Sequence, residues 1–163
     1  MQKSILKHPF KPIIFNDSKI LILGTFPSIK SFENSFYYAH PKNQFWNILS
    51  EIFNEKKPLT IKEKINFLKK HKIALWDVIC ECKRKENKST DDNLEIIKPC
   101  DITNLLKNYP NIKKIATTSR LAQKLLKRHF NIDSIYLPSP SPLNARVNFK
   151  QKVKIWKELL ELM

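Results

Sequence analysis

The chain has 163 residues, of which 42% are hydrophobic, and carries a formal net charge of +15 from 30 Lys and Arg against 15 Asp and Glu. This length and composition predict a single globular domain, residues 1–163, and exclude a chain that is disordered throughout. No apolar run approaches the roughly 20 residues that cross a bilayer, and no apolar signal region follows Met1, so we expect a cytoplasmic protein with no membrane partner.

The strong positive charge favours a polyanionic partner such as nucleic acid, because each phosphate that a Lys or Arg neutralises releases counterions. Most of these basic residues are lysines scattered along the chain, and a lysine-rich composition alone would give the same excess. The charge therefore makes a nucleic-acid partner plausible without identifying one.

Strands and helices are expected to alternate along the chain. Residues 1–18 are predicted to form an extended arm, and Lys19–Gly24 a central strand that is apolar enough to be covered on both faces. Residues 25–42 form a loop longer than a connection needs, and its aromatic side chains argue against disorder. Further along, we expect strands at Ile73–Ile79, Lys113–Thr118 and Ser134–Leu137, helices at Asn43–Asn54, Thr60–Lys70, Asp101–Tyr109, Ser119–Phe130 and Phe149–Leu162, and a polar surface excursion over residues 80–99.

This alternation predicts an α/β fold with three layers, α/β/α, around a central four-stranded and mainly parallel sheet. In such sheets, ligands bind beyond the carboxyl ends of the strands. The loop of residues 25–42 and the proline-rich segment Pro138–Pro142 follow the first and the fourth strand. Both segments therefore lie at the same sheet edge, where they can line one cleft.

The single glycine of the chain, Gly24, ends the first strand. A glycine there permits either a backbone turn with positive φ or the close approach of another group, and both uses suit a binding site. A glycine that only ends the strand is the simpler interpretation. One glycine cannot build a glycine-rich phosphate loop, which disfavours a nucleotide-binding domain of that kind.

The cysteine and histidine patterns do not predict a metal site. Cys80, Cys82 and Cys100 are an odd number and fit reduced thiols, and they fall one ligand short of a four-cysteine site. The four histidines have no paired spacing typical of metal ligands. We therefore expect neither a metal nor a cofactor.

Two motifs resemble the uracil-DNA glycosylase superfamily, and within it the branch of hypoxanthine-DNA glycosylases. They read Leu23-Gly-Thr-Phe-Pro-Ser28 with Tyr37-Tyr-Ala-His-Pro-Lys-Asn-Gln-Phe-Trp46, and Leu137-Pro-Ser-Pro-Ser-Pro-Leu-Asn144. The resemblance implies a monomeric, monofunctional enzyme of base excision repair that uses no metal. It would flip a deaminated base out of double-stranded DNA, hypoxanthine by preference and uracil second, and hydrolyse the N-glycosidic bond.

An alternative stays open where the chain departs from the superfamily. Many members carry Asp or Asn at the position of Phe26 to hold the attacking water, and a phenylalanine cannot do so. The alternative is a non-catalytic module that binds mismatched or damaged DNA on the same fold. Thr117-Thr-Ser119 stands where relatives often carry Phe-Asn-Gly, so we assign no role to this segment.

The resemblance implies a site made of one catalytic residue, a base-binding set and a DNA-binding set. Asn43 is the implied catalytic residue, although its position alone predicts a helix N-cap, and the two roles are compatible. Tyr38 would stack on the flipped base, unless it and Tyr37 only fix the loop to the core. The base-binding set comprises Gly24, Thr25, Phe26, Tyr38 and His40, and the DNA-binding set comprises Lys42, Ser139, Ser141, Pro142, Leu143, Asn144 and Arg146.

Individual members of these sets carry narrower expectations. Leu143 is the candidate wedge that fills the gap in the base stack, and Arg146 would neutralise a phosphate. A plain proline-rich turn is the alternative for this segment. His40 would donate to the base or to a phosphate, or serve only as a loop hydrogen bonder. Asp77, at a strand end, is expected to orient a loop, and we assign no catalytic carboxylate.

Overall fold

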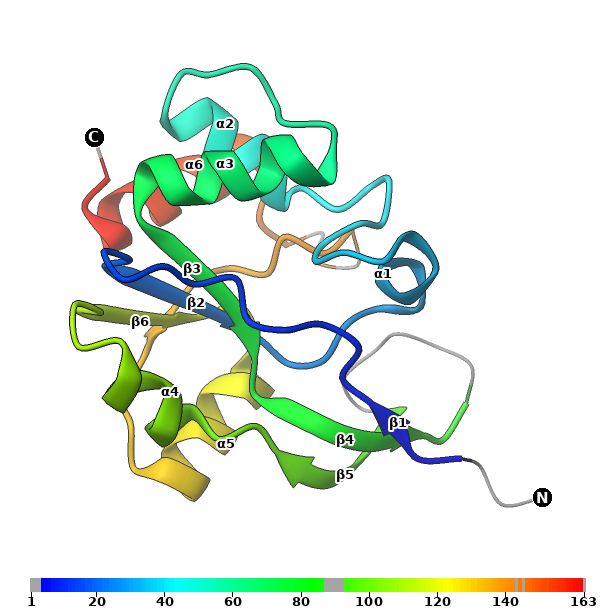
Figure 1. Ribbon diagram of the computed structural model, residues 1–163. Coiled ribbons are helices and arrows are strands. Elements are labelled where there is room, and N and C mark those ends of the chain that lie inside the picture. Colours follow the sequence, from blue (N-terminus) through cyan, green and yellow to red (C-terminus); the bar gives the residue numbers. More distant parts are fainter. Residues whose placement is uncertain (1–3, 87–92, 143, 145, 163) are drawn as a thin grey trace.

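A parallel four-stranded sheet forms the middle layer of the protein, and the computed structural model describes residues 4–86, 93–142, 144 and 146–162 (Figure 1). The strand order is β3-β2-β6-β7, and every neighbouring pair is parallel. The expected α/β fold around a four-stranded sheet is therefore confirmed. The strands are β3 (Ile73–Asp77), β2 (Ile20–Gly24), β6 (Lys114–Thr117) and β7 (Ile135–Tyr136).

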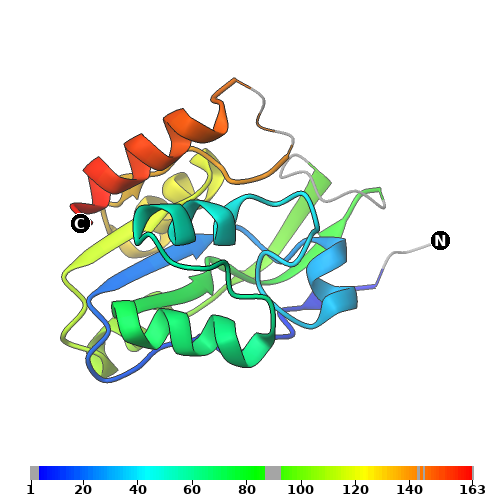
Figure 2. The same cartoon turned by 90° about the horizontal axis from the view of Figure 1, so that it is seen from above.

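Alternate side chains of β2 face opposite helical layers, which explains why its sequence is apolar throughout. Ile20 and Ile22 belong to the core on one face, and Leu21 and Leu23 to the core on the other. The helices of the first layer lie across the sheet when the molecule is seen from above (Figure 2). These are α2 (Phe45–Ile52), α3 (Ile61–His71) and α6 (Phe149–Leu160), and the helices of the second layer are α4 (Ile102–Asn108) and α5 (Arg120–Phe130).

Side-chain caps start α4 and α5, as the sequence predicts. Asp101 accepts a hydrogen bond from the backbone N–H of Asn104 at 3.1 Å, and Ser119 accepts one from Ala122 at 2.9 Å. No helix in the described ranges is long and apolar enough to span a membrane. The cap at Ser119 also fixes the start of α5 next to the end of β6, at the carboxyl edge of the sheet.

The predicted loop over residues 25–42 is wrong in one respect, because it contains a short helix, α1 (Ile29–Asn34). Ser28 starts this helix by accepting a hydrogen bond from the Ser31 backbone N–H at 3.1 Å, and Ser35 ends it in the left-handed conformation. The helix has 6 residues, too few for a helical period to show in the sequence.

Where residues 80–99 are described, most of them form strands rather than the predicted polar excursion. The strand expected to run to Ile79 ends at Asp77, and a new strand follows after Val78. In the new strand, buried Cys82 and Arg84 alternate with charged residues, so its apolar signal is weak. The chain over residues 87–92 lies outside the described residues. The small antiparallel sheet comprises β1 (Leu6–Lys7), β4 (Ile79–Arg84) and β5 (Leu94–Pro99), in the order β1-β4-β5.

The prediction of three reduced thiols is wrong, because Cys80 and Cys100 form a disulfide. The pairing of β4 with β5 places Ile79 opposite Pro99, and it brings the Cα atoms of the two cysteines to 4.7 Å. Cys82 is free and buried, and burial raises the pKa of its thiol. The register between β4 and β5 decides which cysteines pair, and the cysteine spacing does not reveal that register.

Candidate active site

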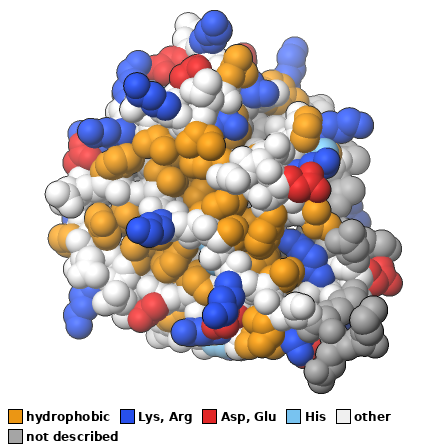
Figure 3. Space-filling model, turned by 45° about the vertical axis from the view of Figure 1, so that its right-hand side comes forward, with side chains coloured by type: hydrophobic (Ala, Val, Ile, Leu, Met, Phe, Trp, Pro, Cys, Tyr) orange, Lys and Arg blue, Asp and Glu red, His pale blue; other side chains and the backbone are white. Residues whose placement is uncertain are grey.

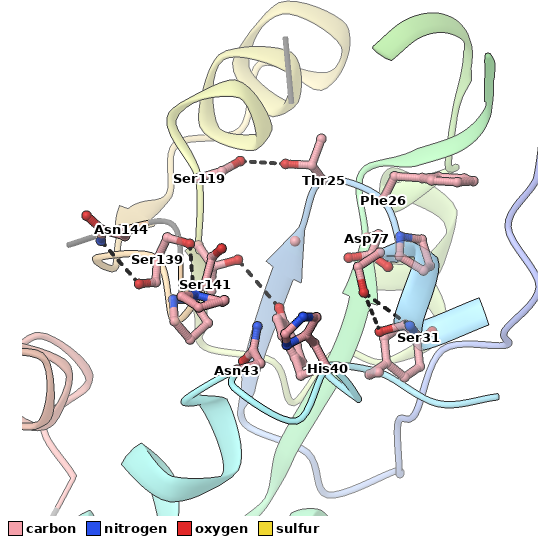
Figure 4. A pocket seen from close by; sticks show the side chains of 18 residues that line it. Thr25, Phe26, Ser31, His40, Asn43, Asp77, Ser119, Ser139, Ser141 and Asn144 are labelled. Atoms are coloured by element: carbon pink, nitrogen blue, oxygen red, sulfur yellow. Dashed lines mark hydrogen bonds between the residues drawn. The ribbon is translucent and has the colours of Figure 1, made fainter. Parts of the chain in front are cut away.

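A pocket of about 580 Å³ opens at the sheet edge where the four parallel strands end (Figure 4). Its walls come from the segments that follow β2, β3, β6 and β7 and from the loop between α1 and α2. The two conspicuous segments of the sequence therefore meet at one cleft, as predicted. The members of the predicted sets that line it are Gly24, Thr25, Phe26, Tyr38, His40, Asn43, Ser139, Ser141, Pro142 and Asn144.

Gly24 lies on the floor of this pocket, where another side chain comes too close for a Cβ atom. It is paired in register with Asp77 of the neighbouring strand. A Cβ on Gly24 would lie 2.5 Å from Asp77 Oδ1 and 3.1 Å from the hydroxyl oxygen of Tyr38. Its φ is not positive, so close approach, and not a left-handed turn, is the reason that a glycine is needed here.

Asp77 brings a carboxylate into the pocket, and His8 of the N-terminal arm holds it. The Nε2 atom of His8 lies 2.7 Å from Asp77 Oδ2, and the two side chains are only 3% and 6% exposed. Oδ1 of Asp77 has no hydrogen-bond partner among the described residues, and Asp77 lines the pocket. A buried carboxylate with one free oxygen is a strong hydrogen-bond acceptor for whatever enters.

Tyr38 presents an aromatic ring to the pocket, and Phe45 supports that ring from behind. The two rings are stacked with centroids 4.0 Å apart and planes 4° from parallel. Burial, and to a smaller extent the negative charge of Asp77, raises the pKa of Tyr38 far above its ordinary value, so the phenol stays protonated. Tyr37 is buried instead and donates its hydroxyl to the backbone oxygen of Lys11 at 2.8 Å. Both tyrosines line the pocket, and Tyr37 also fixes the loop through its hydrogen bond to Lys11.

The side chain of Asn43 is oriented by the first turn of α2. The predicted N-cap at Asn43 is wrong by one residue, because α2 begins at Phe45 and Gln44 occupies the N-cap position. Asn43 instead lies just before the helix, where its Oδ1 accepts a hydrogen bond from the Phe45 backbone N–H at 2.9 Å. With Oδ1 engaged there, Nδ2 is the atom that points toward the centre of the pocket in Figure 4. Asn43 therefore offers a hydrogen-bond donor to a ligand.

His40 and Thr25 also line the pocket, but both are partly engaged in loop structure. Nδ1 of His40 accepts the Lys42 backbone N–H at 3.0 Å, which leaves Nε2 of the neutral ring as a donor. The Thr25 hydroxyl lies 2.6 Å from the Ser119 hydroxyl, so it ties the ends of β2 and β6 together. Of the two, His40 has the atom that remains available to a ligand.

The proline-rich segment Pro138–Pro142, after β7, lies at the mouth of the pocket and is held by several hydrogen bonds. Its backbone is anchored by Gln44, whose N–H donates to the Pro140 carbonyl at 2.9 Å, and by Trp156, whose Nε1 donates to the Pro138 carbonyl at 2.9 Å. Asn144 closes the loop by donating its Nδ2 to the Ser139 carbonyl at 3.2 Å. The loop is therefore held in shape before any ligand arrives.

Two described members of the DNA-binding set, Lys42 and Arg146, are not among the residues that line the pocket. Lys42 and Arg146 are exposed, and Leu143 lies outside the described residues. Figure 3 turns this side of the molecule forward and shows hydrophobic side chains gathered across the middle, with Lys and Arg side chains around them. Such a face suits a ligand with an apolar part inside and phosphates at the edge.

The lining residues outside the predicted sets include Asp77, Thr118 and Ser119, which end or follow strands. Thr118 has its hydroxyl 3.4 Å from that of Tyr38, so the segment that was given no role forms part of the wall. Their position at the carboxyl ends of β3 and β6 was a usable signal, because the carboxyl ends of all strands of a parallel sheet lie at this same edge. Together the pocket offers an aromatic face, amide and imidazole donors and one carboxylate acceptor, which suits a planar heterocycle with both carbonyl and N–H groups.

Comparisons with known proteins find relatives along nearly the whole chain. A sequence model of the uracil DNA glycosylase superfamily matches residues 12–160, which leaves His8 outside the match. A Methanosarcina barkeri protein named hypoxanthine DNA glycosylase is 32% identical over 155 residues, covering 93% of this chain and 96% of that protein. A protein of the same name from Methanosarcina acetivorans is 28% identical over 156 residues, covering 94% and 97%.

A solved structure is similar over the same extent. It is the solution NMR structure of a Methanosarcina acetivorans protein proposed to be a uracil DNA glycosylase, and it matches with a TM-score of 0.77. The two sequences are 27% identical, and the match covers 96% of this chain and 99% of the other.

Proposed function

The chain belongs to the uracil DNA glycosylase superfamily, and we propose that, as a DNA glycosylase of this superfamily, it releases hypoxanthine from DNA, with uracil as its second substrate. Two relatives along nearly the full length are named hypoxanthine DNA glycosylase, which supports this choice of base. The observation that carries the proposal is the orientation of Asn43, whose Nδ2 faces a pocket walled by an aromatic ring. Hypoxanthine and uracil both present a carbonyl oxygen that such a donor can bind.

The substrate in this proposal is a double-stranded DNA with a deaminated, mispaired base, bound by a monomer in the cytoplasm. The base must leave the stack before it can enter the pocket, and this costs a few kcal/mol, least at a mispaired site. Tyr38, backed by Phe45 at 4.0 Å, would repay part of that cost by stacking on the extruded base. The exposed Lys42 and Arg146 are available for phosphates that flank it.

The proposed reaction is hydrolysis: the oxygen of a water molecule bonds to the deoxyribose C1′ atom as the bond to the base breaks, and the proton that the water loses ends on the released base. As the N-glycosidic bond breaks, its electron pair goes to the base, and negative charge spreads to the carbonyl oxygen. Donors fixed in advance, such as Asn43 Nδ2 and the imidazole of His40, stabilise that charge without reorganising. The ring of Phe26 lines the pocket and packs against Phe32, with ring centroids 5.6 Å apart. The Phe26 side chain has no polar atom that could hold the water.

A monofunctional reaction is favoured by what surrounds the pocket. No lysine is among its described lining residues, so the proposal has no amine that could form an imine with the sugar. The expected product is an abasic site with an unbroken strand. Trapping of a covalent protein–DNA adduct by sodium borohydride would contradict this part of the proposal.

The test is a base-release assay on duplexes that contain one hypoxanthine, uracil, xanthine or mismatched thymine, with alkali to cut abasic sites. Asn43→Ala removes the donor, and we expect kcat on hypoxanthine to fall about 100- to 1000-fold, as for other preorganised donors. Asn43→Asp keeps an oxygen for the Phe45 N–H but replaces the donor by an acceptor, so it should be at least as impaired. Asn104→Ala, an exposed asparagine of α4, is the matched control and should keep full activity.

Other outcomes would separate the alternatives. Release of uracil alone would support the proposed glycosylase activity and contradict hypoxanthine as its substrate. No release from any duplex, together with binding of mismatched duplex that Asn43→Ala leaves unchanged, would support the non-catalytic module that Phe26 leaves open. A sedimentation experiment that finds dimers at assay concentrations would contradict the monomer.

A further inference from the structure

We propose that His8 is a positioning residue that, by holding Asp77, sets the requirement of the pocket for a base with a ring N–H next to a carbonyl group. This inference rests on the proposed base release and concerns how the base is chosen. His8 belongs to the N-terminal arm, before both motifs that line the pocket, and lies 69 positions from Asp77. It lies outside the range that the superfamily model matches.

Backbone hydrogen bonds hold the arm against the two sheets both before and after His8 in the sequence, so the imidazole has a fixed position. The His8 backbone N–H donates to the Cys80 carbonyl at 2.7 Å, and β1 pairs with β4 just before it. Farther along, Ile13 and Leu75 exchange two backbone hydrogen bonds of 2.9 Å. The His8 ring also contacts Phe26 edge-on, with centroids 5.9 Å apart. The arm therefore holds the imidazole of His8 against Asp77 with little freedom.

The Nδ1 atom of the His8 ring lies close to both the backbone carbonyl and the backbone N–H of Phe10. Nδ1 lies 2.9 Å from the Phe10 carbonyl oxygen and 3.2 Å from the Phe10 N–H nitrogen. A neutral ring can accept from that N–H, and a protonated ring can donate to that carbonyl. In both states Nε2 carries a hydrogen, which it donates to Asp77 Oδ2 at 2.7 Å. Asp77 thus keeps a donor on one oxygen whichever state the histidine takes.

Holding Oδ2 fixes where the second carboxylate oxygen points. Oδ1 lies beside Gly24, which has no side chain to cover it, and the described residues give it no hydrogen-bond partner. The titratable groups placed against Asp77 are His8 from the arm and Tyr37 and Tyr38 from the loop before α2, and His40 lies in the same pocket. Both phenols stay protonated, because burial and then the charge of Asp77 raise their pKa. Oδ1 is left as an acceptor facing the base.

An acceptor at this place discriminates between bases by their ring nitrogens. Hypoxanthine has N1–H next to its C6 carbonyl and uracil has N3–H between two carbonyls, so either can donate to Asp77 Oδ1 while Asn43 Nδ2 donates to the carbonyl. Adenine and cytosine present a bare ring nitrogen instead, and two acceptors then face each other without a hydrogen. Guanine shares the N1–H, so this pair does not reject it. The pair therefore favours the deaminated form of adenine over adenine itself.

The experiment compares two bases of the same ring system in the same duplex: hypoxanthine, and unsubstituted purine, which lacks the carbonyl and the N1–H. In His8→Leu, we expect the ratio of kcat/KM for hypoxanthine to that for purine to fall about 10- to 100-fold, the range for a hydrogen bond to a charged group. His8→Gln, whose amide can still donate to Asp77, should keep the ratio within a few-fold of wild type. Asp77→Asn should lower this ratio of kcat/KM values as much as His8→Leu does, and the double variant should lower it little further.

The matched control is His71→Leu. His71 is also a partly buried histidine beside a carboxylate, 3.1 Å from Glu55, but it lies on α3 away from the pocket. This variant should leave the ratio unchanged even where stability falls. Inhibition by free hypoxanthine against free purine gives the same comparison for variants that turn over too slowly.

The two proposals fail in different ways. If His8→Leu loses activity equally on both bases, so that the ratio stays within about threefold of wild type, His8 only supports the fold and the inference is wrong while base release stands. If the wild-type protein releases no base at all, the proposed function is wrong, and the inference falls with it. A ratio that collapses in His8→Leu and survives in His8→Gln and His71→Leu supports both.

Discussion

Replacing Gly24 by alanine tests the packing on the pocket floor. The new methyl group would lie 2.5 Å from Asp77 Oδ1 and 3.1 Å from the Tyr38 hydroxyl oxygen, and Asp77 cannot turn away without breaking its 2.7 Å hydrogen bond to His8. Overpacking of this kind costs about 1–3 kcal/mol. Because the φ of Gly24 is not positive, alanine also restricts the unfolded chain and returns about 0.4–1 kcal/mol. We expect a net loss of about 1–2 kcal/mol in the free energy of unfolding.

Urea unfolding followed by the fluorescence of the three tryptophans measures this loss. The control is Gly24→Ala in an Asp77→Ala background, where the carboxylate that the methyl group meets is gone. There the penalty should vanish, or the alanine should stabilise slightly, because only the 3.1 Å contact with the Tyr38 hydroxyl and an ordinary 3.6 Å contact with Thr118 remain. A Gly24→Ala protein as stable as wild type, or an equal penalty in both backgrounds, would refute this account of the glycine.

Two further predictions concern the aromatic wall and the small sheet. Tyr38→Ala should weaken binding of a duplex with an uncleavable substrate analogue by about 1–3 kcal/mol, which is what stacking on one base contributes. Tyr38→Phe should bind like wild type, because the Tyr38 hydroxyl that it removes makes only a 3.4 Å contact with Thr118. Fluorescence anisotropy measures both, and equal losses would contradict stacking. The Cys80–Cys100 disulfide closes a sequence separation of 20, so Cys100→Ser should lower the free energy of unfolding by about 3 kcal/mol in oxidising buffer. Dithiothreitol should lower wild-type stability equally and leave the variant unchanged in urea unfolding.

The pattern of the sequence was sufficient for the main sheet. The apolar run that became β2 predicted a strand buried on both faces, and its side chains do alternate between two cores. The same pattern did not predict β4. In this strand Cys82 and Arg84 alternate with charged residues, and several of its residues are only partly buried. The pattern also failed for α1, which is shorter than the period needed to detect it. Elements with few apolar residues leave little periodic signal.

The candidate site was predictable where a residue type carries its own meaning. Gly24 marked a place where another group comes close to the backbone. Asn43 was predicted both as a cap and as a site residue; it lies one position before the N-cap Gln44, accepts the Phe45 N–H and lines the pocket. Asp77 was expected to orient a loop and was not assigned to the site, because an aspartate at a strand end is as easily paired with a lysine on the surface. Only its neighbours, His8 and Gly24, show that it is buried with one oxygen free.

The sequence by itself determined the alternation of strands and helices, the edge of the sheet where ligands bind, and the motifs that resemble one superfamily. These are local properties, because a strand, a cap or a motif depends on residues close together in the chain. The tertiary structure alone decided which distant residues meet: the pairing of Cys80 with Cys100, the orientation of the Asn43 amide, and the contact of His8 with Asp77, 69 positions away. Such contacts depend on the register between strands and the path of the arm, and neither leaves a periodic trace in the sequence.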